Sequence, residues 1–342
     1  MTYFCFIDTS CATIMFNIKT PPLMLTLATI ALTATVAFGI QSKAQSTHTT
    51  ESTGPQYNAP YQVYAQNLQP VTAALSPASH DNQSFALKLA AHELHSQVAY
   101  VYDVDTGETL YEKNHYLVRP IASITKLMTA MVVLDAQQDL DELIEITRDD
   151  IDTLKYTRSR LAIGSKLSRR DLLLLALMSS ENRAASALGR NYPGGLPAFV
   201  RAMNEKAQAL GMRYTLFVEP TGLSSDNLST APDLAKMLQA AATYPLIQQF
   251  STHESHTVSP KPGQQLRYVN TNRLVSNSDW QIHVSKTGFI NEAGRCLVLH
   301  TRLDNRNVAI VLLNAQGRYS GMGDANRIRQ AYQKQPALLA AR

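Results

Sequence analysis

The fold and the chemistry of this sequence both depend on one stretch, Pro120-Ile121-Ala122-Ser123-Ile124-Thr125-Lys126-Leu127-Met128-Thr129-Ala130-Met131. Ser123 and Lys126 are three residues apart, so in a helix their side chains lie on one face. A serine hydroxyl becomes a strong nucleophile only when a neighbouring base takes its proton. A lysine can be that base when burial lowers its pKa, and the apolar residues around the pair predict a buried central helix. Pro120 stands where such a helix can begin.

By itself this pair is a weak indication, because about one Ser-x-x-Lys is expected by chance in a chain of this length. The alternative is a core helix with an incidental serine and a lysine whose head reaches solvent. The choice between the two therefore depends on other stretches.

Composition narrows the class of protein. The 342 residues are 45% hydrophobic and 17% charged, which suits one large or two modest globular domains. The net charge of +4 comes without a basic run, so we expect no nucleic-acid partner. Cys5 and Cys11 precede the expected mature start and Cys296 then stands alone, which excludes an internal disulfide. No Cys/His cluster has metal-ligand spacing, so we expect no metal and no cofactor.

The N-terminus reads as an export signal. Residues 23–40 are apolar, threonine or glycine, and Ser42-Lys43-Ala44 then offers a small-x-small cleavage site. We expect a signal peptide over residues 1–44, with Met15 as an alternative start, and a periplasmic mature protein. The alternative is an uncleaved anchor, since eighteen such residues approach membrane-spanning length. A flexible polar segment is expected over 45–83, followed by one domain over 84–342.

The remaining pattern predicts an α+β fold. A helix is expected over 84–95, and a helical block fills the middle of the chain, with helices expected at 171–178, 196–210 and 231–242. Residues 98–104 and 109–112 are expected to form the strands of a hairpin, and residues 281–285 lead into a strand that carries Lys286-Thr287-Gly288. Residues 296–302 and 308–314 alternate and are expected to form a second hairpin. A last helix is expected at 324–334. The first and last strands should share one antiparallel sheet, with the helical block inserted between them.

Three short motifs follow one another along the chain: Ser123-x-x-Lys126, Ser180-x-Asn182 and Lys286-Thr287-Gly288. The first opens a buried helix, the second lies at a junction of two helices, and the third lies on a strand. The ordered trio resembles the serine penicillin-recognising enzymes, which include D-alanyl-D-alanine peptidases and serine β-lactamases. Further stretches resemble the low-molecular-mass D-alanyl-D-alanine peptidases, the endopeptidases above all; these are residues 119–123, 172–182, 219–223 and 286–289.

The resemblance covers roughly residues 95–335 and carries several expectations. It implies a three-layer αβα fold in which helices flank a five-stranded antiparallel sheet, beside an all-helical subdomain that carries the Ser123 helix. It implies peptidoglycan peptides as substrates and β-lactam antibiotics as covalent inhibitors. The 54 residues that follow Gly288 suffice for a hairpin and a helix but not for an extra domain. No stable membrane anchor is expected after signal cleavage, because residues 337–342 are too short for an amphipathic anchor.

The resemblance also implies a role for each motif residue. Ser123 attacks the carbonyl of a D-Ala amide bond, and Lys126 accepts its proton. Ser180 relays the proton to the leaving amine, while Asn182 holds substrate amide groups and the head of Lys126. Lys286 attracts the substrate carboxylate and keeps Lys126 neutral by like-charge repulsion.

Three positions beside Lys286 complete the expected site. Thr287 hydrogen-bonds the same carboxylate, and Gly288 lets the substrate backbone lie close to the strand. The oxyanion hole is expected from the backbone N–H groups of Ser123 and Phe289, and one such donor is typically worth about a hundredfold or more in rate.

Two residues could mislead this assignment. Ser225-Asp226-Asn227 is a literal Ser-Asp-Asn, but it follows a turn-rich loop, so we assign the second motif to Ser180 and Asn182. Glu219 stands where a class A β-lactamase could keep its deacylation base. The run Glu-Pro-Thr-Gly-Leu resembles the peptidase loop instead, and we expect Glu219 to be structural.

Two rival functions stay open from the residues. A serine β-lactamase would share the three motifs but regenerate quickly after reacting with penicillin. A non-catalytic β-lactam sensor or wall-binding module would be expected to lack Ser123, Lys126 or Lys286, and all three are present. Whether an endopeptidase or a carboxypeptidase activity dominates follows from the resemblance alone.

Overall fold

The computed structural model describes residues 87–90 and 93–334. The predicted signal peptide and polar segment lie outside the described residues. The helix expected over 84–95 is wrong for its described part, since residues 87–90 and 94–95 are not helical. The Leu87 N–H instead donates to the carbonyl of Leu110 at 2.7 Å, and Leu87 and Leu94 are buried against the sheet. Apolar spacing misled the prediction because this segment packs as an extended chain.

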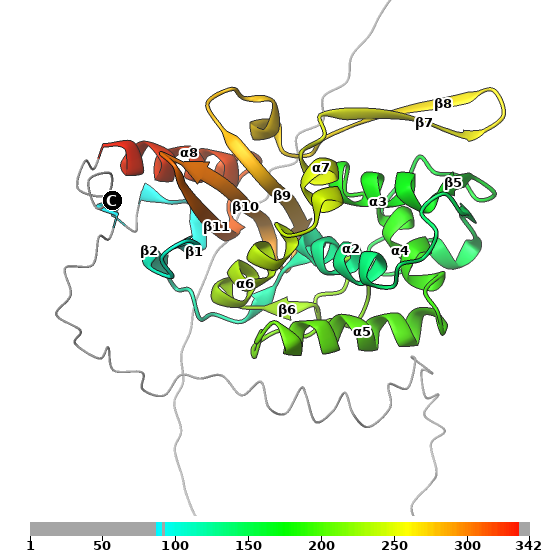
Figure 1. The fold of residues 1–342 in the computed structure, drawn as a ribbon, viewed down its shortest axis with the longest axis horizontal. Coiled ribbons are helices and arrows are strands. Elements are labelled where there is room, and N and C mark those ends of the chain that lie inside the picture. The colour runs from blue at the N-terminus through cyan, green and yellow to red at the C-terminus, as the bar shows by residue number, and fades with distance from the viewer. Residues whose placement is uncertain (1–86, 91–92, 335–342) are drawn as a thin grey trace, which may run out of the picture. The chain divides into compact units, whose positions relative to one another are not determined.

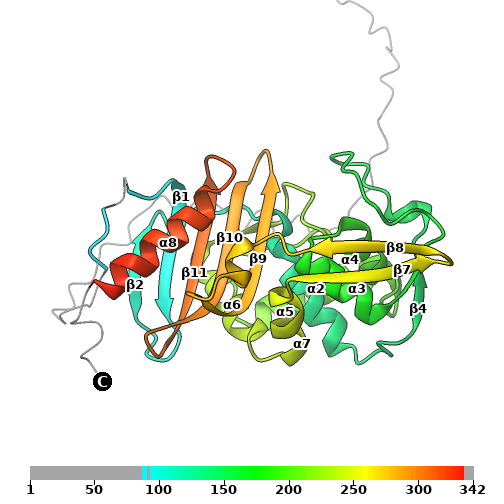
Figure 2. The ribbon, with the colours of Figure 1, turned by 90° about the horizontal axis from the view of Figure 1, so that it is seen from above.

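A five-stranded antiparallel sheet forms one half of this domain (Figures 1 and 2). Its spatial order is β2-β1-β11-β10-β9. The strands are β1 (Ser96–Asp103), β2 (Thr109–Lys113), β9 (Gln281–Ile290), β10 (Gly294–Leu303) and β11 (Arg306–Ala315). The first strand pairs with the last, with Ser96 opposite Ala315. The predicted pairing of the early and late strands is therefore confirmed.

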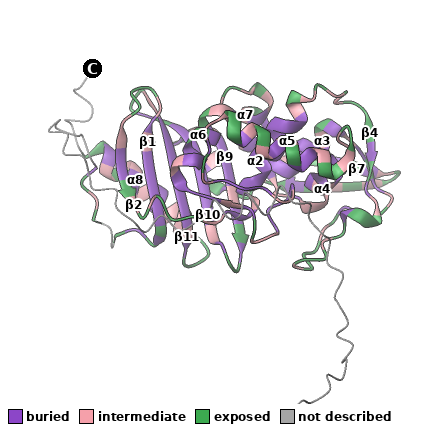
Figure 3. Ribbon diagram, turned by 90° about the horizontal axis from the view of Figure 1, so that it is seen from below, coloured by how far each residue is buried: buried purple, intermediate pink, exposed green. Residues whose placement is uncertain are grey.

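The two faces of the sheet bury separate cores, because successive residues of a strand point to opposite sides. On one face, residues such as Val101, Leu299 and Ile310 pack under α8 (Ser320–Gln333). On the other face, Val298 and Val311 pack against α6 (Ala231–Ala241) and the helical block. Figure 3 shows the strands buried between these layers. The three-layer α+β prediction is confirmed.

The helical block carries Lys126 of the first motif and Asn182 of the second. It contains α2 (Thr125–Asp135), α3 (Arg169–Met178), α4 (Asn182–Arg190), α5 (Gly195–Ala209) and α7 (Pro245–Thr252). Residues Thr125 to Val133 of α2 are all buried, so this helix is the centre of the block. Ser168 caps α3 by accepting the N–H of Asp171 at 3.0 Å.

Short elements connect these parts. Small antiparallel pairs are formed by β3 (Arg119–Pro120) with β6 (Leu228–Ser229), by β4 (Leu143–Glu145) with β5 (Lys166–Ser168), and by β7 (Ser255–Lys261) with β8 (Gln264–Val269). The 3₁₀ turns include η2 (Ala122–Ile124), η3 (Arg148–Asp150) and η4 (Arg273–Ser276). Pro120 thus lies on a strand and does not begin the helix. Over the described part of the chain, no helix combines the length and apolarity needed to cross a bilayer.

Candidate active site

Ser123 lies in the 3₁₀ turn η2, just ahead of α2, and the backbone there is tightly confined. Ala122 has a φ of +48°, a left-handed conformation that is uncommon for a residue with a side chain. A Cβ added to Gly222 would lie 1.9 Å from the Ala122 carbonyl oxygen. A Cβ added to Gly288 would lie 3.0 Å from the Ser123 nitrogen. Two glycines therefore let the chain approach the Ser123 turn from either side.

This geometry changes the reason for Gly288. The expectation gave it the task of leaving room for substrate. The structure shows that a side chain there would first press on the protein's own turn, at Ile121, Ala122 and Ser123. The absence of a side chain at Gly288 lets the strand β9 lie close to the backbone of Ser123.

Lys126 is fully buried and uses all three of its N–H donors. Its Nζ donates to Ser123 Oγ at 2.9 Å, to Asn182 Oδ1 at 2.8 Å and to the Thr221 carbonyl at 2.5 Å. Burial lowers the pKa of Lys126 to about 8, against the opposing pull of nearby carboxylates, led by Glu219. A pKa of 8 leaves about a tenth of the lysine neutral at pH 7. The pair can thus transfer a proton near neutral pH.

Lys286 is a second buried lysine in the site. Its Nζ donates to Ser180 Oγ at 2.9 Å and to the Thr287 carbonyl at 2.9 Å. Burial lowers the pKa of Lys286 well below its ordinary value, and repulsion from Lys126 lowers it further. The expectation gave this repulsion the task of keeping Lys126 neutral, whereas burial is what lowers the pKa of Lys126.

The second motif lies where predicted, in the turn between α3 and α4. Ser180 has a φ of +59°, and Glu181 caps α4 by accepting the N–H of Arg183 at 3.3 Å. Asn182, the first residue of α4, donates from Nδ2 to the hydroxyl of Thr157 at 3.0 Å. One chain of hydrogen bonds therefore joins Ser123, Lys126 and Asn182, and a second joins Ser180 to Lys286.

A cleft of about 330 Å³ opens above these groups. Its lining includes all the expected site residues except the two lysines, which lie buried beneath it, and adds residues that the motifs did not indicate: Thr157, Leu223, Thr271, Arg295 and Arg318. The Phe289 ring is half-exposed, with the Arg295 guanidinium 4.6 Å from its centre. The Thr287 hydroxyl donates to that of Thr271 at 2.6 Å. In the described part of the chain, no group of three His, Cys, Asp or Glu side chains could hold a metal ion.

The literal Ser-Asp-Asn at 225–227 has a different place. Asn227 is fully buried, accepts the N–H of Val218 at 2.8 Å, and donates to Thr125 Oγ1 at 3.1 Å. It also donates to the Glu219 carboxylate at 2.9 Å. Ser225 does not line the cleft. The motif fastens the loop that carries Thr221, as the assignment to a loop predicted.

The chain matches the family model described as D-alanyl-D-alanine carboxypeptidase over residues 85–317. This chain belongs to the D-alanyl-D-alanine carboxypeptidase family. Relatives in the family include a D-alanyl-D-alanine endopeptidase of Pseudomonas aeruginosa, 53% identical over 70% of this chain and 77% of the relative. A D-alanyl-D-alanine endopeptidase of Escherichia coli is 50% identical over 69% of this chain and 77% of the relative.

Solved structures agree with the family. The crystal structure of the Streptomyces K15 DD-transpeptidase has a TM-score of 0.65 at 28% identity, covering 71% of this chain and 98% of that one. Penicillin-binding protein D2 of Listeria monocytogenes, in an ampicillin-bound form, has a TM-score of 0.60 at 31% identity, covering 70% and 98%. The fold of these DD-peptidases and transpeptidases is the fold described above.

Sequence reasoning missed the partners that surround the motifs. The Thr221 carbonyl accepts from Lys126, and the Thr157 hydroxyl accepts from Asn182. A backbone carbonyl leaves no signature in residue type. Thr157 lies in a polar loop 25 residues before Asn182, and no local pattern there marks it.

Proposed function

We propose that this chain is an exported serine D-alanyl-D-alanine endopeptidase that hydrolyses D-Ala peptide bonds of peptidoglycan through an acyl-enzyme on Ser123. The observation that carries the proposal is the 2.9 Å hydrogen bond from the buried Lys126 Nζ to Ser123 Oγ at the cleft. The printed names of the P. aeruginosa and E. coli relatives support an endopeptidase over a carboxypeptidase.

Acylation begins when neutral Lys126 takes the proton of Ser123 and the Oγ attacks the D-Ala carbonyl carbon. The oxyanion receives hydrogen bonds from the backbone N–H groups of Ser123 and Phe289. The C–N bond then breaks, and the leaving amine receives the proton by way of Ser180, whose Oγ is held by Lys286. A water later attacks the ester carbonyl and gives up a proton, which returns by way of Lys126 to Ser123 Oγ as the Oγ–C bond breaks and the product leaves with a free D-Ala carboxylate.

Substrate binding uses the same walls of the cleft. Asn182 has one Nδ2 proton committed to Thr157, and its second is free for a substrate carbonyl. Lys286 and the Thr287 hydroxyl attract a substrate carboxylate on the leaving-group side. β-Lactam antibiotics enter the same reaction and stay attached as covalent inhibitors.

Intact-mass measurement after penicillin treatment tests the nucleophile. One covalent adduct is expected, on a peptide that contains Ser123, and none in Ser123→Ala. Ser225→Ala is the matched control and should be acylated like the wild type. An adduct that survives in Ser123→Ala would overturn the assignment.

The bond specificity needs a second assay. Purified cross-linked muropeptides should be cut to monomers, while monomeric pentapeptides lose their terminal D-Ala more slowly. The opposite preference would make the protein a carboxypeptidase. Rapid release of hydrolysed penicillin would make it a β-lactamase, and failure to cut either substrate would leave a binding module.

Export is the remaining part of the proposal. Cleavage after Ser42-Lys43-Ala44 should give a periplasmic protein whose N-terminal sequence begins near Gln45. An intact N-terminus in the membrane fraction would favour the uncleaved anchor.

A further inference from the structure

We propose that Thr157 is a positioning residue that fixes the orientation of the Asn182 amide, and that Asp152 gives Thr157 this property. The inference rests on the proposed function, because the amide matters through Lys126 and the substrate. It concerns a loop, residues 151–165, that lies outside all three motifs.

The orientation of the Asn182 amide follows from the direction of each hydrogen bond. The Thr157 hydroxyl has one proton, and it donates that proton to Asp152 Oδ2 at 2.7 Å. A carboxylate can only accept, so the direction of this bond is fixed. The hydroxyl therefore meets Asn182 with lone pairs alone, 3.0 Å from Nδ2. The NH₂ end of the amide is required on that side.

The other end of the amide then follows. With Nδ2 facing Thr157, the Oδ1 faces Lys126 and accepts from its Nζ at 2.8 Å. A flipped amide would point two N–H donors at the ammonium and lose both bonds. One directed chain of hydrogen bonds thus runs through Asp152, Thr157, Asn182, Lys126 and Ser123. The Asp152 carboxylate, at the far end of this chain, determines that Lys126 faces the Oδ1 of Asn182.

The loop is built to hold Thr157 in place. Asp152 accepts the N–H groups of Leu154 at 2.8 Å, Lys155 at 2.9 Å and Thr157 at 2.8 Å, which closes the turn. Lys155 also forms an ion pair with Glu292, in the turn between β9 and β10.

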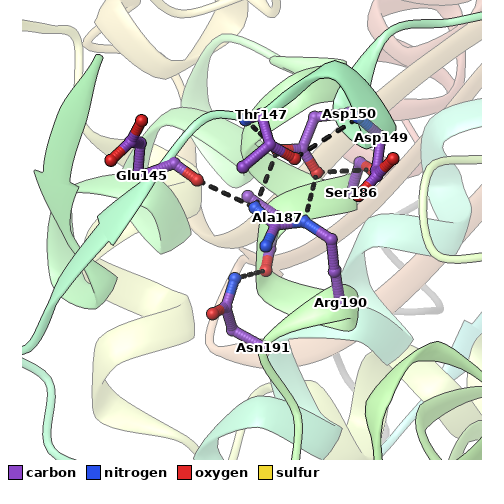
Figure 4. A network of polar contacts seen from close by, with 8 residues as sticks. All are labelled: Glu145, Thr147, Asp149, Asp150, Ser186, Ala187, Arg190 and Asn191. Carbon is purple, nitrogen blue, oxygen red and sulfur yellow. Dashed lines mark hydrogen bonds and ion pairs between the residues drawn. The ribbon is translucent and has the colours of Figure 1, made fainter. Parts of the chain in front are cut away.

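The root of the loop is fastened to the helix that carries Asn182. Asp150, immediately before the loop, has a fully buried side chain and accepts from Ser186 at 3.0 Å and from Arg190 at 2.9 Å. Figure 4 shows these contacts converging on α4, and Arg190 also donates to the Glu145 carbonyl. Because Asn182 begins the same helix, the loop and the amide share one support.

Three variants separate positioning from folding. Thr157→Val removes the hydroxyl and should lower the rate of penicillin acylation about tenfold, since small misplacements of reacting groups carry large rate penalties. Thr157→Ser keeps the hydroxyl and should stay within about twofold of the wild type. Thr153→Val makes the same change at an exposed threonine of the same loop and should have no effect.

The pH profile gives a readout that a structural role would not move. When the amide flips in Thr157→Val, its donors disfavour the ammonium and lower the pKa of Lys126. The acidic limb of the acylation profile should shift to lower pH, while Thr157→Ser and Thr153→Val keep the wild-type profile. Glu219, Glu181 and Asp152 also act on the pKa of Lys126, and Lys286 is the neighbouring buried lysine; none of them is changed in these variants.

A double mutant tests whether Thr157 affects acylation through Asn182. If Thr157 acts through Asn182, Thr157→Val should cost nothing further in an Asn182→Ala background. An equal loss in both backgrounds, or wild-type acylation by Thr157→Val, would overturn the inference while the function stands. Absence of any Ser123 adduct in the wild type would instead refute the proposed function itself.

Discussion

Replacing Glu219 by glutamine separates a structural carboxylate from a catalytic base. The Glu219 carboxylate accepts five hydrogen bonds from its own loop. Oε2 accepts the Thr221 N–H at 2.6 Å and the Thr221 hydroxyl at 2.5 Å. Oε1 accepts the N–H groups of Gly222 at 2.6 Å and Ser224 at 3.3 Å, and the Asn227 amide at 2.9 Å.

The expected loss of stability follows from these contacts. In Glu219→Gln one acceptor becomes an NH₂ group, so at least one backbone N–H of the loop faces a donor, at about 1–3 kcal/mol. The remaining bonds lose their ionic partner, so the total is about 3 kcal/mol. For a domain of this size that corresponds to a fall in Tm of roughly 6–12 °C. Glu205→Gln, on the exposed side of α5, is the control and should melt like the wild type.

In catalysis, Glu219→Gln should change the pH dependence of acylation and leave the rate of deacylation unchanged. Glu219 holds the pKa of Lys126 up against burial, so its neutralisation should lower that pKa further below about 8. The acidic limb of acylation then moves to lower pH. Intact-mass measurements over time should show that the penicillin acyl-enzyme of Glu219→Gln breaks down as slowly as that of the wild type. Fast wild-type turnover that collapses in Glu219→Gln, with acyl-enzyme accumulating, would refute the structural role and identify a β-lactamase.

Three further perturbations test other parts of the site. Ser180→Ala should slow acylation by about a hundredfold or more, while Ser225→Ala leaves it unchanged in the same stopped-flow assay; the reverse pattern would mean that the second motif is misassigned. Gly222→Ala should cost about 3 kcal/mol or more in chemical denaturation, because its Cβ would meet the Ala122 carbonyl oxygen at 1.9 Å. Gly211→Ala shares the positive φ but has open space, so it should cost only about 1–2 kcal/mol, and equal losses would contradict the steric argument. The wild-type acylation rate should rise with pH toward about 8 and then level off, as Lys126 loses its proton; a rate that is already flat from pH 6 would argue against Lys126 as the base.

Sequence periodicity was enough for the sheet and most of the helical block. Residues 98–104, 296–302 and 308–314 are rich in apolar residues on both faces, as strands between two cores require, and each of these strands formed. The helix prediction failed at residues 87–90, because the apolar spacing of this segment carries no information about what it packs against. Helix α7 was missed, since Pro245–Thr252 is short and is set by its contacts with neighbouring elements.

The candidate site likewise has residues that the sequence indicated and features that it did not. The three motifs indicated Ser123, Lys126, Ser180, Asn182 and Lys286 as candidate site residues, and the structure places them together at one cleft. The left-handed backbone at Ala122 could not be predicted, because it belongs to a turn that packs against Gly222 and Gly288, far along the chain. The hydroxyl of Thr157 was missed for the same reason, as only the folded loop brings it to Asn182.

The pairing of β1 with β11 also sets the order in which this molecule can assemble. Ser96 and Ala315 are 219 residues apart (315 − 96), so closing the sheet joins segments from nearly opposite ends of the domain. Strands β9, β10 and β11 follow one another through tight turns and can zip locally, whereas β1 and β2 must wait for them. A growing chain therefore holds its first hairpin without a partner until its last strand has been made. A chain that stops before β11 would have all three motifs in its sequence and still lack the sheet that brings Lys286 to Ser180.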